Sequence, residues 1–219
     1  MPETPSFQHY LLRIALIGVS PRVARLLSVP DDLTLDELHE VLQLVFGWSR
    51  ESYYRFRIHG QEIGTPRQGR SRLLREFRLR QREKFFYTYD LLDLWEWELR
   101  VLDIQPQATA EADPRCLGGR NAVPPEGCGG PRSYMRILDR HKYCPPVVEQ
   151  ALVEQALERM AKALPDQNSR ELLRDLVSQG LERAVRRLED YARFEPEHFS
   201  LKEAKERLSR FCPYGRTRP

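Results

Sequence analysis

The chain lacks the features that identify membrane, secreted and disulfide-rich proteins. Its longest uninterrupted apolar stretch, Ile14 to Val19, is far shorter than the roughly 18 residues that a membrane-spanning helix needs. Its first residues, Met1 to Pro5, have neither the basic start nor the small-residue cleavage site of a secretory signal. It contains only 4 cysteines in 219 residues. We therefore expect a cytoplasmic protein whose cysteines are thiols or metal ligands.

A strong excess of one charge is also missing. Lys and Arg number 35 and Asp and Glu number 32, which gives a net charge of +3. So small an excess does not by itself indicate a nucleic-acid partner. The sequence has no internal repeat, no Cys-x-x-Cys pair and no recognisable helix-turn-helix. Hydrophobic residues make up 41%, enough for a packed core in one domain with an appendage or in two small domains.

The first fifty residues predict a β-β-α arrangement. Tyr10 to Val19 is rich in aliphatic and β-branched residues and has Arg13 as its only charge, which is typical of a mostly buried strand. Arg22 to Val29 alternates, and we expect a second strand antiparallel to the first. Thr34 to Glu37 is a capping box, so a helix begins there, and Gly47 can provide the left-handed residue that ends it.

The middle of the chain predicts an antiparallel meander. Tyr53 to Ile58 and Gln61 to Gly64 have the pattern of a hairpin. Lys84 to Asp90 and Leu94 to Ile104 are two further strands, the second with the period of two of a half-buried strand. One face of that strand carries Trp95, Trp97, Leu99 and Val101, and the other carries Glu96, Glu98 and Arg100.

The C-terminal half predicts a loop followed by helices. Gln105 to Pro131 is dense in Gly and Pro and has little periodicity, so we expect a loop there. Val147 to Leu164 and Arg170 to Arg193 are amphipathic helices, the second with a costly internal Gly180, and a short helix follows Ser200. The predicted fold is α+β, with a β-β-α opening, an antiparallel meander and a C-terminal helical section. Its predicted parts are a core (1–143), a helical hairpin (144–193) and a segment that packs back on the core (194–219).

Motifs distributed through most of the chain carry a resemblance to a known family. They are Val29-Pro30, Thr34-Leu35, Leu38-His39, Phe46-Gly47-Trp48, Phe86-Tyr87-Thr88-Tyr89-Asp90, Asp93, Trp95-Glu96, Cys116-Leu117, Gly119, Ala122, Pro124-Pro125-Glu126, Cys128-Gly129-Gly130-Pro131, Phe194-Glu195-Pro196-Glu197 and Phe199. In this order they resemble the plasmid pRiA4b ORF-3-like family, whose members occur on plasmids and in insertion sequences. The resemblance implies a compact α+β domain with the Pro-Pro-Glu/Cys-Gly-Gly loop packed on the sheet. It implies little chemistry, so we expect an uncharacterised, non-enzymatic binding or accessory protein of plasmid or transposon origin.

Departures from the family pattern reduce the number of candidate metal ligands. Histidines are common in the family where this chain has Ser52 or Tyr54, and where it has Trp97. A further cysteine is common at Val123, and a glycine at Leu92. The retained Cys116 and Cys128 are weak metal candidates because their spacing matches no zinc knuckle. We expect no cofactor, with zinc as the alternative; buried thiols are the simpler interpretation.

A basic segment provides the candidate nucleic-acid interface. It spans residues 67 to 84, with aromatic and basic residues just upstream. The candidates are Tyr53, Tyr54, Arg55, Arg57, Arg67, Arg70, Arg72, Arg75, Arg78, Arg80, Arg82 and Lys84. Cations interleaved with aromatic rings can hold phosphates and stack on bases of DNA or RNA. The alternative is a solvated charged edge partly balanced by acids.

Two other hypotheses come from clusters elsewhere. The first is an acidic-aromatic corner, defined by Tyr87, Tyr89, Asp90, Asp93, Trp95 and Glu96. Crowded carboxylates there could form a cation or acid-base site together with the Cys116/Cys128 loop, although short acids in turns more often bond backbone amides. The second is a protein-protein adaptor role for the helical hairpin at 147–193, whose helices otherwise pack on the domain. No membrane contact is expected.

Overall fold

The computed structural model describes residues 7–64, 66–107, 113–163 and 169–213. They belong to two compact units. The first comprises residues up to 135 together with 196 onward, and the second comprises 136–195. The first unit holds the sheet and the helices packed on it, and the second is helical. None of the described helices is long and apolar enough to cross a membrane.

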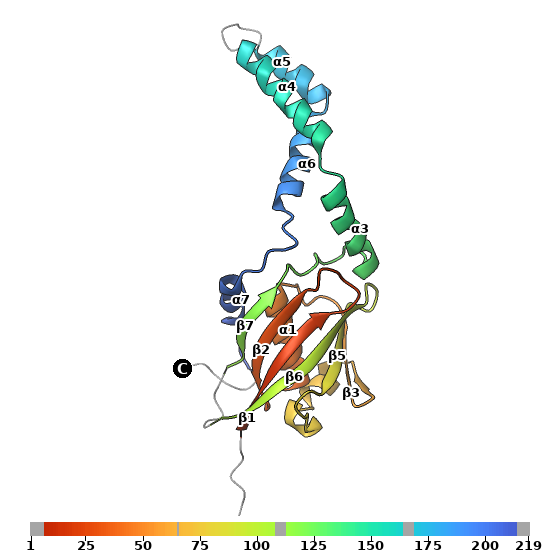
Figure 1. The fold of residues 1–219 in the computed structure, drawn as a ribbon, viewed down its shortest axis with the longest axis vertical. Coiled ribbons are helices and arrows are strands. Elements are labelled where there is room, and N and C mark those ends of the chain that lie inside the picture. The colour runs from red at the N-terminus through yellow and green to blue at the C-terminus, as the bar shows by residue number, and fades with distance from the viewer. Residues whose placement is uncertain (1–6, 65, 108–112, 164–168, 214–219) are drawn as a thin grey trace, which may run out of the picture. The chain divides into compact units, whose positions relative to one another are not determined.

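A seven-stranded antiparallel sheet forms the first unit (Figure 1). Its strands, in chain order, are β1 (Phe7–Leu16), β2 (Ala24–Pro30), β3 (Tyr54–Ile58), β4 (Gln61–Ile63), β5 (Lys84–Tyr89), β6 (Trp95–Gln107) and β7 (Arg115–Arg120). Their order across the sheet is β4-β3-β5-β6-β1-β2-β7. The predicted α+β class is therefore confirmed, and so is the antiparallel pairing of the first two strands.

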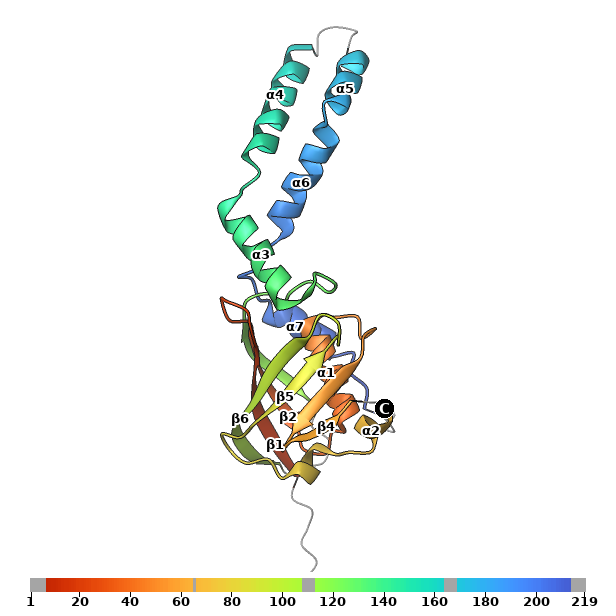
Figure 2. The same ribbon diagram turned by 90° about the vertical axis from the view of Figure 1, so that its right-hand side faces the viewer.

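Helix α1 (Leu35–Phe46) covers one face of the sheet, which curves around it (Figure 2). Its predicted ends are confirmed. The Thr34 hydroxyl accepts from the Glu37 N–H at 3.1 Å, and the Glu37 carboxylate accepts from the Thr34 N–H at 2.8 Å. Gly47, at φ 78°, ends the helix in the left-handed region. The Phe46 ring stacks on Trp97 of β6 at 4.0 Å, which joins the helix to the inner face of the sheet.

The short helix α2 (Pro66–Arg70) and the 3-10 helix η1 (Leu74–Phe77) follow the β3–β4 hairpin. Leu74 and Phe77 are buried, so this segment is anchored although most of its arginines are exposed. Helix α7 (Leu201–Leu208) belongs to the same unit. The Ser200 hydroxyl caps it by accepting from the Glu203 N–H, as the sequence predicts.

The loop predicted for residues 105–131 is wrong in part. Strand β6 continues to Gln107, β7 lies within the segment, and helix α3 (Gly130–Tyr143) begins near its end. Strand β7 lacks an apolar alternation because a glycine occupies an inward position. A Cβ at Gly119 would lie 2.7 Å from the ring of Phe199 and 2.8 Å from the side chain of Arg25. Close packing, rather than turn formation, accounts for this glycine.

The second unit contains α4 (Val147–Ala163), α5 (Ser169–Ser178) and α6 (Leu181–Arg193). Leu164, the predicted end of the first of these helices, lies outside the described residues. The single helix predicted for 170–193 is wrong, because Gly180 adopts φ 93° and separates α5 from α6. Helix α4 packs against α5 and α6 through small buried side chains, among them Ala156 and Ala184.

Candidate functional site

The structure separates the members of the acidic-aromatic corner. Tyr87, Tyr89 and Trp95 lie on the inner face of the sheet and are buried. Glu96 lies on the outer face, where it forms an ion pair with Arg57 at 3.0 Å. Neighbouring residues of a strand point to opposite faces, so Trp95 and Glu96 cannot share one site.

The two aspartates of the corner accept hydrogen bonds from backbone N–H groups. Asp90 adopts φ 55°, and its Oδ1 accepts from the N–H groups of Leu92 and Asp93 at 3.0 and 3.3 Å. Asp93 Oδ2 accepts from the N–H of Gly129 at 3.1 Å. Both carboxylates therefore hold the β5–β6 turn and the loop that packs on it, the ordinary role of short acids in turns.

The Pro-Pro-Glu loop contacts the inner aromatic residues. The indole N–H of Trp48 donates to the carbonyl of Pro124 at 2.9 Å. The Tyr89 hydroxyl donates to Glu126 at 2.9 Å. Burial, and then the nearby Glu126 carboxylate, raise the pKa of Tyr89. This tyrosine is therefore a hydrogen-bond donor rather than a base at neutral pH.

The basic segment and its upstream residues are distributed over several surfaces. Tyr54 is buried and Tyr53 is 75% exposed. Five of the basic side chains bond to carboxylates: Arg55 to Glu62, Arg57 to Glu96, Arg70 to Asp36, Arg72 to Glu76 and Lys84 to Glu98. Four others, Arg75, Arg78, Arg80 and Arg82, are exposed and have no ion pair within the described ranges. The side chain of Arg67 lies outside the described residues.

Two arginines that the sequence-based candidate set omitted complete a row on the outer face. Lys84 of β5 pairs with Arg100 of β6, and Arg100 pairs with Arg13 of β1. Residues directly opposite in an antiparallel sheet share a face with Cβ atoms about 5 Å apart. We name Lys84, Arg100 and Arg13 the cation row. The sequence signal was the isolated charge of Arg13 in an otherwise apolar strand.

One carboxylate partly neutralises the cation row. Glu98 lies 3.2 Å from the nitrogens of both Lys84 and Arg100. Burial by itself would raise the pKa of Glu98, but the hydrogen bonds from these two cations hold it below the ordinary value. Arg13 is exposed and has no ion-pair partner in the part of the chain that the structure describes. The three cations and Glu98 alone sum to a formal charge of +2, and Asp103, opposite Leu11 on the same face, is a neighbouring carboxylate.

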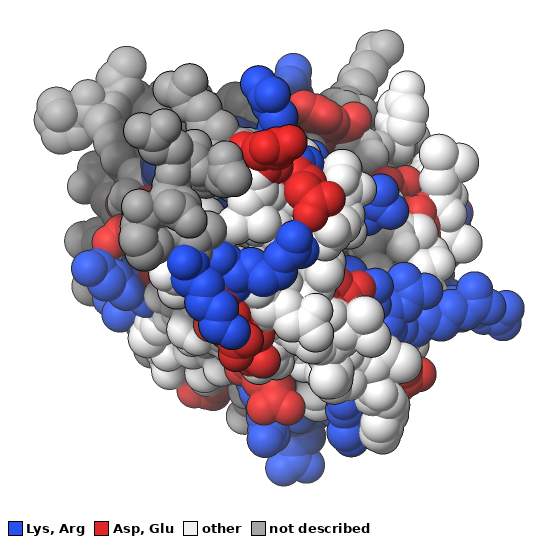
Figure 3. All heavy atoms as spheres, turned by 90° about the horizontal axis from the view of Figure 1, so that it is seen from above, with Lys and Arg blue, Asp and Glu red and all other residues white. Residues whose placement is uncertain are grey.

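One more cation, Arg82, lies next to the cation row, and the nearest aromatic ring, Phe86, is covered by basic side chains. The guanidinium of Arg100 donates to the carbonyl of Arg82 at 3.4 Å, so exposed Arg82 adjoins the row. Arg57 and Lys84 lie 4.5 and 5.5 Å from the ring centre of Phe86. On the face in Figure 3 basic and acidic side chains interleave. The row differs from such a surface because its cations are neighbours.

The two candidate metal ligands have different surroundings. Cys116 lies on the inner side of β7 near Arg25, whereas Cys128 lies near Asp93 and Tyr134. Both thiols are free, and burial raises the pKa of each. Among the described residues no group of three or more His, Cys, Asp or Glu side chains could hold a metal ion.

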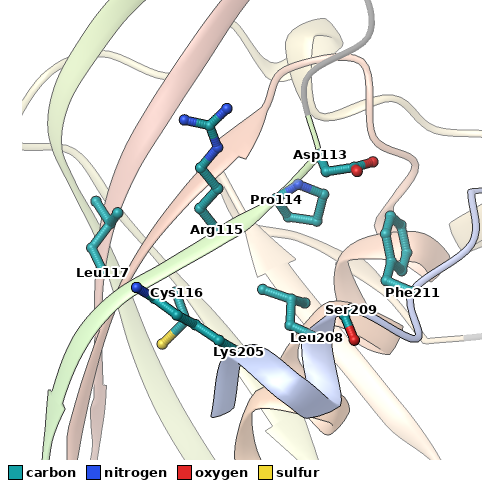
Figure 4. A pocket seen from close by; sticks show the side chains of 9 residues that line it. All are labelled: Asp113, Pro114, Arg115, Cys116, Leu117, Lys205, Leu208, Ser209 and Phe211. Carbon is teal, nitrogen blue, oxygen red and sulfur yellow. The ribbon is translucent and has the colours of Figure 1, made fainter. Parts of the chain in front are cut away.

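A cavity of about 320 Å³ lies between β7 and α7 (Figure 4). Pro114, Leu208 and Phe211 line it, and each of these side chains is buried. Figure 4 shows Arg115 pointing away from the cavity and Lys205 extending beside Cys116. Because its pKa is raised, the Cys116 thiol is protonated at neutral pH and is a poor nucleophile.

A buried polar network that sequence reasoning missed lies under a second cavity of the same unit. The Tyr87 hydroxyl lies 2.7 Å from His39 Nδ1, and Gln43 Nε2 donates to the same hydroxyl at 2.7 Å. Burial lowers the pKa of His39 to about 4, so the ring is neutral at pH 7. Helical spacing places His39 and Gln43 on one face of α1, but only the fold brings Tyr87 to them.

Comparisons with known proteins agree with this fold. A family model described as plasmid pRiA4b ORF-3-like protein matches residues 8–203. An uncharacterized protein of Sinorhizobium fredii, y4hQ, is 32% identical over 162 residues, which cover 70% of this chain and 77% of that protein. The crystal structure of MM3350, a protein of unknown function from Methanosarcina mazei Go1, has a TM-score of 0.62 at 21% identity. That match covers 90% of this chain and 96% of the other.

Proposed function

The chain belongs to the plasmid pRiA4b ORF-3-like family, and we propose that this member is a cytoplasmic accessory protein of plasmid or transposon origin that binds nucleic acid. The binding surface is the cation row with the adjoining Arg82. The relatives named above are uncharacterised and supply no substrate. The nucleic-acid part of the proposal therefore depends on the geometry of this chain alone.

The cross-strand register of the cation row is the single observation that carries the proposal. Like charges directly opposite on adjacent strands destabilise a sheet by several tenths of a kcal/mol each. Here three cations lie side by side on β5, β6 and β1, and Glu98 pairs with only two of them. A phosphate backbone would relieve this repulsion and release its own counterions.

The same surface favours contact with phosphates over reading of bases. Base stacking requires an open aromatic face. Arg57 and Lys84 lie over the ring of Phe86, and the indole and phenol rings of Trp95, Trp97 and Tyr87 are buried on the opposite face. We therefore expect binding of low sequence specificity, with dissociation constants on the order of 10⁻⁴ to 10⁻⁶ M at physiological salt.

Fluorescence anisotropy with labelled single-stranded DNA, duplex DNA and RNA tests the proposal. We expect saturable binding at low salt that weakens as salt is added. Arg13→Gln should weaken binding because Arg13 has no ion pair among the described residues, and its loss leaves no carboxylate behind. Arg159→Gln, which removes an exposed and paired arginine from the helical unit, is the matched control and should bind as the unmodified chain does. No detectable binding of any probe at low salt would exclude the proposal.

A covalent reaction at the acidic-aromatic corner is the alternative that we do not favour. Its aspartates accept backbone N–H bonds, and Glu96 points to the other face of the sheet. A general acid or base needs a position beside the reacting group together with a partner. We therefore assign no bond-making or bond-breaking step to this corner.

Binding of a protein partner by the helical unit is a second candidate function. Large apolar side chains are exposed on α4 and α5, including Val148 at 79%, Leu157 at 61% and Leu173 at 46%. Large apolar side chains left exposed on a surface are candidates for contact with a partner. Light scattering in solution tests the simplest case, self-association. A mass above that of one chain, which Leu157→Gln reduces, would support it, and a single-chain mass at all concentrations would contradict self-association.

A further inference from the structure

The second cavity of the sheet unit has the size of a small-molecule site. It lies beside the first turns of α1 and the start of β3, with a volume of about 390 Å³, within the range of roughly 300 to 1,000 Å³ found for such sites. We name it the α1 hollow. The residues that matter for its chemistry are Asp36, His39, Glu40, Arg50, Glu51 and Arg70. The cation row lies on the other face of the sheet, so the hollow is independent of the proposed nucleic-acid surface.

The floor of the hollow presents one fixed hydrogen-bond donor. His39 is only 7% exposed, and its ring stacks on Tyr54 at 3.9 Å with an interplanar angle of 13°. Gln43 donates to the Tyr87 hydroxyl, and we assign the proton of that hydroxyl to His39 Nδ1, the acceptor 2.7 Å from it. The ring proton of neutral His39 is then on Nε2. The bond to Tyr87 engages Nδ1, Nε2 has no hydrogen-bond partner within the described residues, and His39 is one of the residues that line the hollow.

The rim of the hollow carries charges of both signs. Asp36 accepts from the Tyr54 hydroxyl at 2.7 Å and from Arg70 Nε at 3.0 Å. Arg50 bonds Glu40 at 2.6 Å through Nη1 only. A guanidinium has five N–H donors, so Arg50 retains donors for a ligand. Glu51 is exposed and has no ion pair in the part of the chain that is described.

This distribution selects against simple anions and simple cations. Three carboxylates and two guanidiniums, with a neutral imidazole, give the hollow a formal charge of −1. Phosphate would therefore meet a net repulsion, and an amine alone would leave the donors of His39 and Arg50 unused. A molecule that carries a carboxylate and an ammonium a few bonds apart can use both the hydrogen-bond donors and the carboxylates of the hollow.

We propose that the α1 hollow binds a small zwitterion of the amino-acid type. Its carboxylate accepts from His39 Nε2–H and from Arg50, and its ammonium lies against the carboxylates of Glu51 and Glu40. A neutral histidine suits this task because it donates a hydrogen bond without adding a charge that the buried network would have to accommodate.

Binding of the free L-amino acids, added one at a time, tests the proposal. The readouts are thermal unfolding and the side-chain ¹⁵N signals of His39, with inorganic phosphate and butylamine as separate arms. We expect at least one amino acid to saturate below about 10 mM and to shift the His39 Nε2 signal. Phosphate and butylamine should do neither.

Glu51→Gln is the decisive variant, because Glu51 lies at the exposed rim and can be changed without disturbing the core. It should weaken binding about tenfold, whereas Glu62→Gln, on an exposed strand outside the hollow, should leave it unchanged. The proposal is overturned if no amino acid saturates, if phosphate or butylamine binds as well as any amino acid, or if Glu51→Gln binds as the unmodified chain does. Each result is independent of nucleic-acid binding.

Discussion

Acidification should destabilise the sheet unit through His39 in particular. The folded protein holds the pKa of this histidine at about 4, against an ordinary value of 6.5, chiefly because the ring is buried and also because Arg50 lies near it. Asp36 acts in the opposite direction, less strongly than burial but more strongly than Arg50. The ring therefore stays neutral in the folded state under conditions in which the unfolded chain takes up a proton.

The sign of the effect follows from which state binds the proton. Above pH 6.5 both states leave His39 neutral, and the histidine adds no pH dependence. Between pH 6.5 and 4 the unfolded state binds more protons, so the free energy of unfolding falls as the pH falls. At 1.36 kcal/mol per pKa unit, the loss approaches about 3 kcal/mol near pH 4. This is a large part of the free energy of unfolding of a typical domain, which is roughly 5 to 15 kcal/mol.

Urea unfolding followed by tryptophan fluorescence provides the assay. All three tryptophans, Trp48, Trp95 and Trp97, are buried in the sheet unit, so the signal reports that unit. Because carboxylates such as Glu76, Glu83 and Glu98 also titrate near this window, the measurement compares the unmodified chain with His39→Gln. The variant is expected to be less stable at pH 7 but to lose less stability between pH 7 and 4.5. Parallel losses in the two proteins would refute the assignment of the effect to His39.

Two further predictions concern packing and metal content. Gly119→Ala should destabilise the sheet unit by about 1 to 3 kcal/mol, since its Cβ would lie within 3 Å of Phe199 and Arg25; Gly118→Ala, with no atom within 4 Å, is the control in the same urea assay. Equal stabilities of the two variants would contradict the packing account. Elemental analysis of the purified protein should find no stoichiometric zinc, and a full equivalent that is lost in Cys128→Ser would establish a metal site instead.

The sequence predicted correctly those features that depend only on neighbouring residues, such as helix caps and the alternation of a strand. Thr34, Glu37 and Gly47 mark both ends of α1 because a cap needs only neighbouring residues. The period of two in β6 predicted which of its side chains are buried. Strand β7 was missed because its inward position at Gly119 has no side chain. The ring of Phe199, a residue 80 positions later in the chain, leaves no room for one.

The candidate surfaces could be predicted only in part, since they depend on strand register. Arg13 and Arg100 become neighbours through the β1–β6 pairing, which no local pattern specifies. The corner residues Trp95 and Glu96 are adjacent in sequence and therefore lie on opposite faces. Tyr54 was a candidate base-stacking residue, but it is buried against His39. Composition showed a basic segment in the sequence and could not assign its members to one surface.

The salt dependence of nucleic-acid affinity tests the central claim about the cation row most directly. The dissociation constant of single-stranded DNA is measured over a series of salt concentrations for the unmodified chain, for Arg13→Gln and for Arg159→Gln. If Arg13 contacts a phosphate, the slope of log K against log salt should decrease in magnitude by about 0.7 in Arg13→Gln and stay unchanged in Arg159→Gln. Equal slopes for all three proteins would contradict the assignment of the outer face as the binding surface.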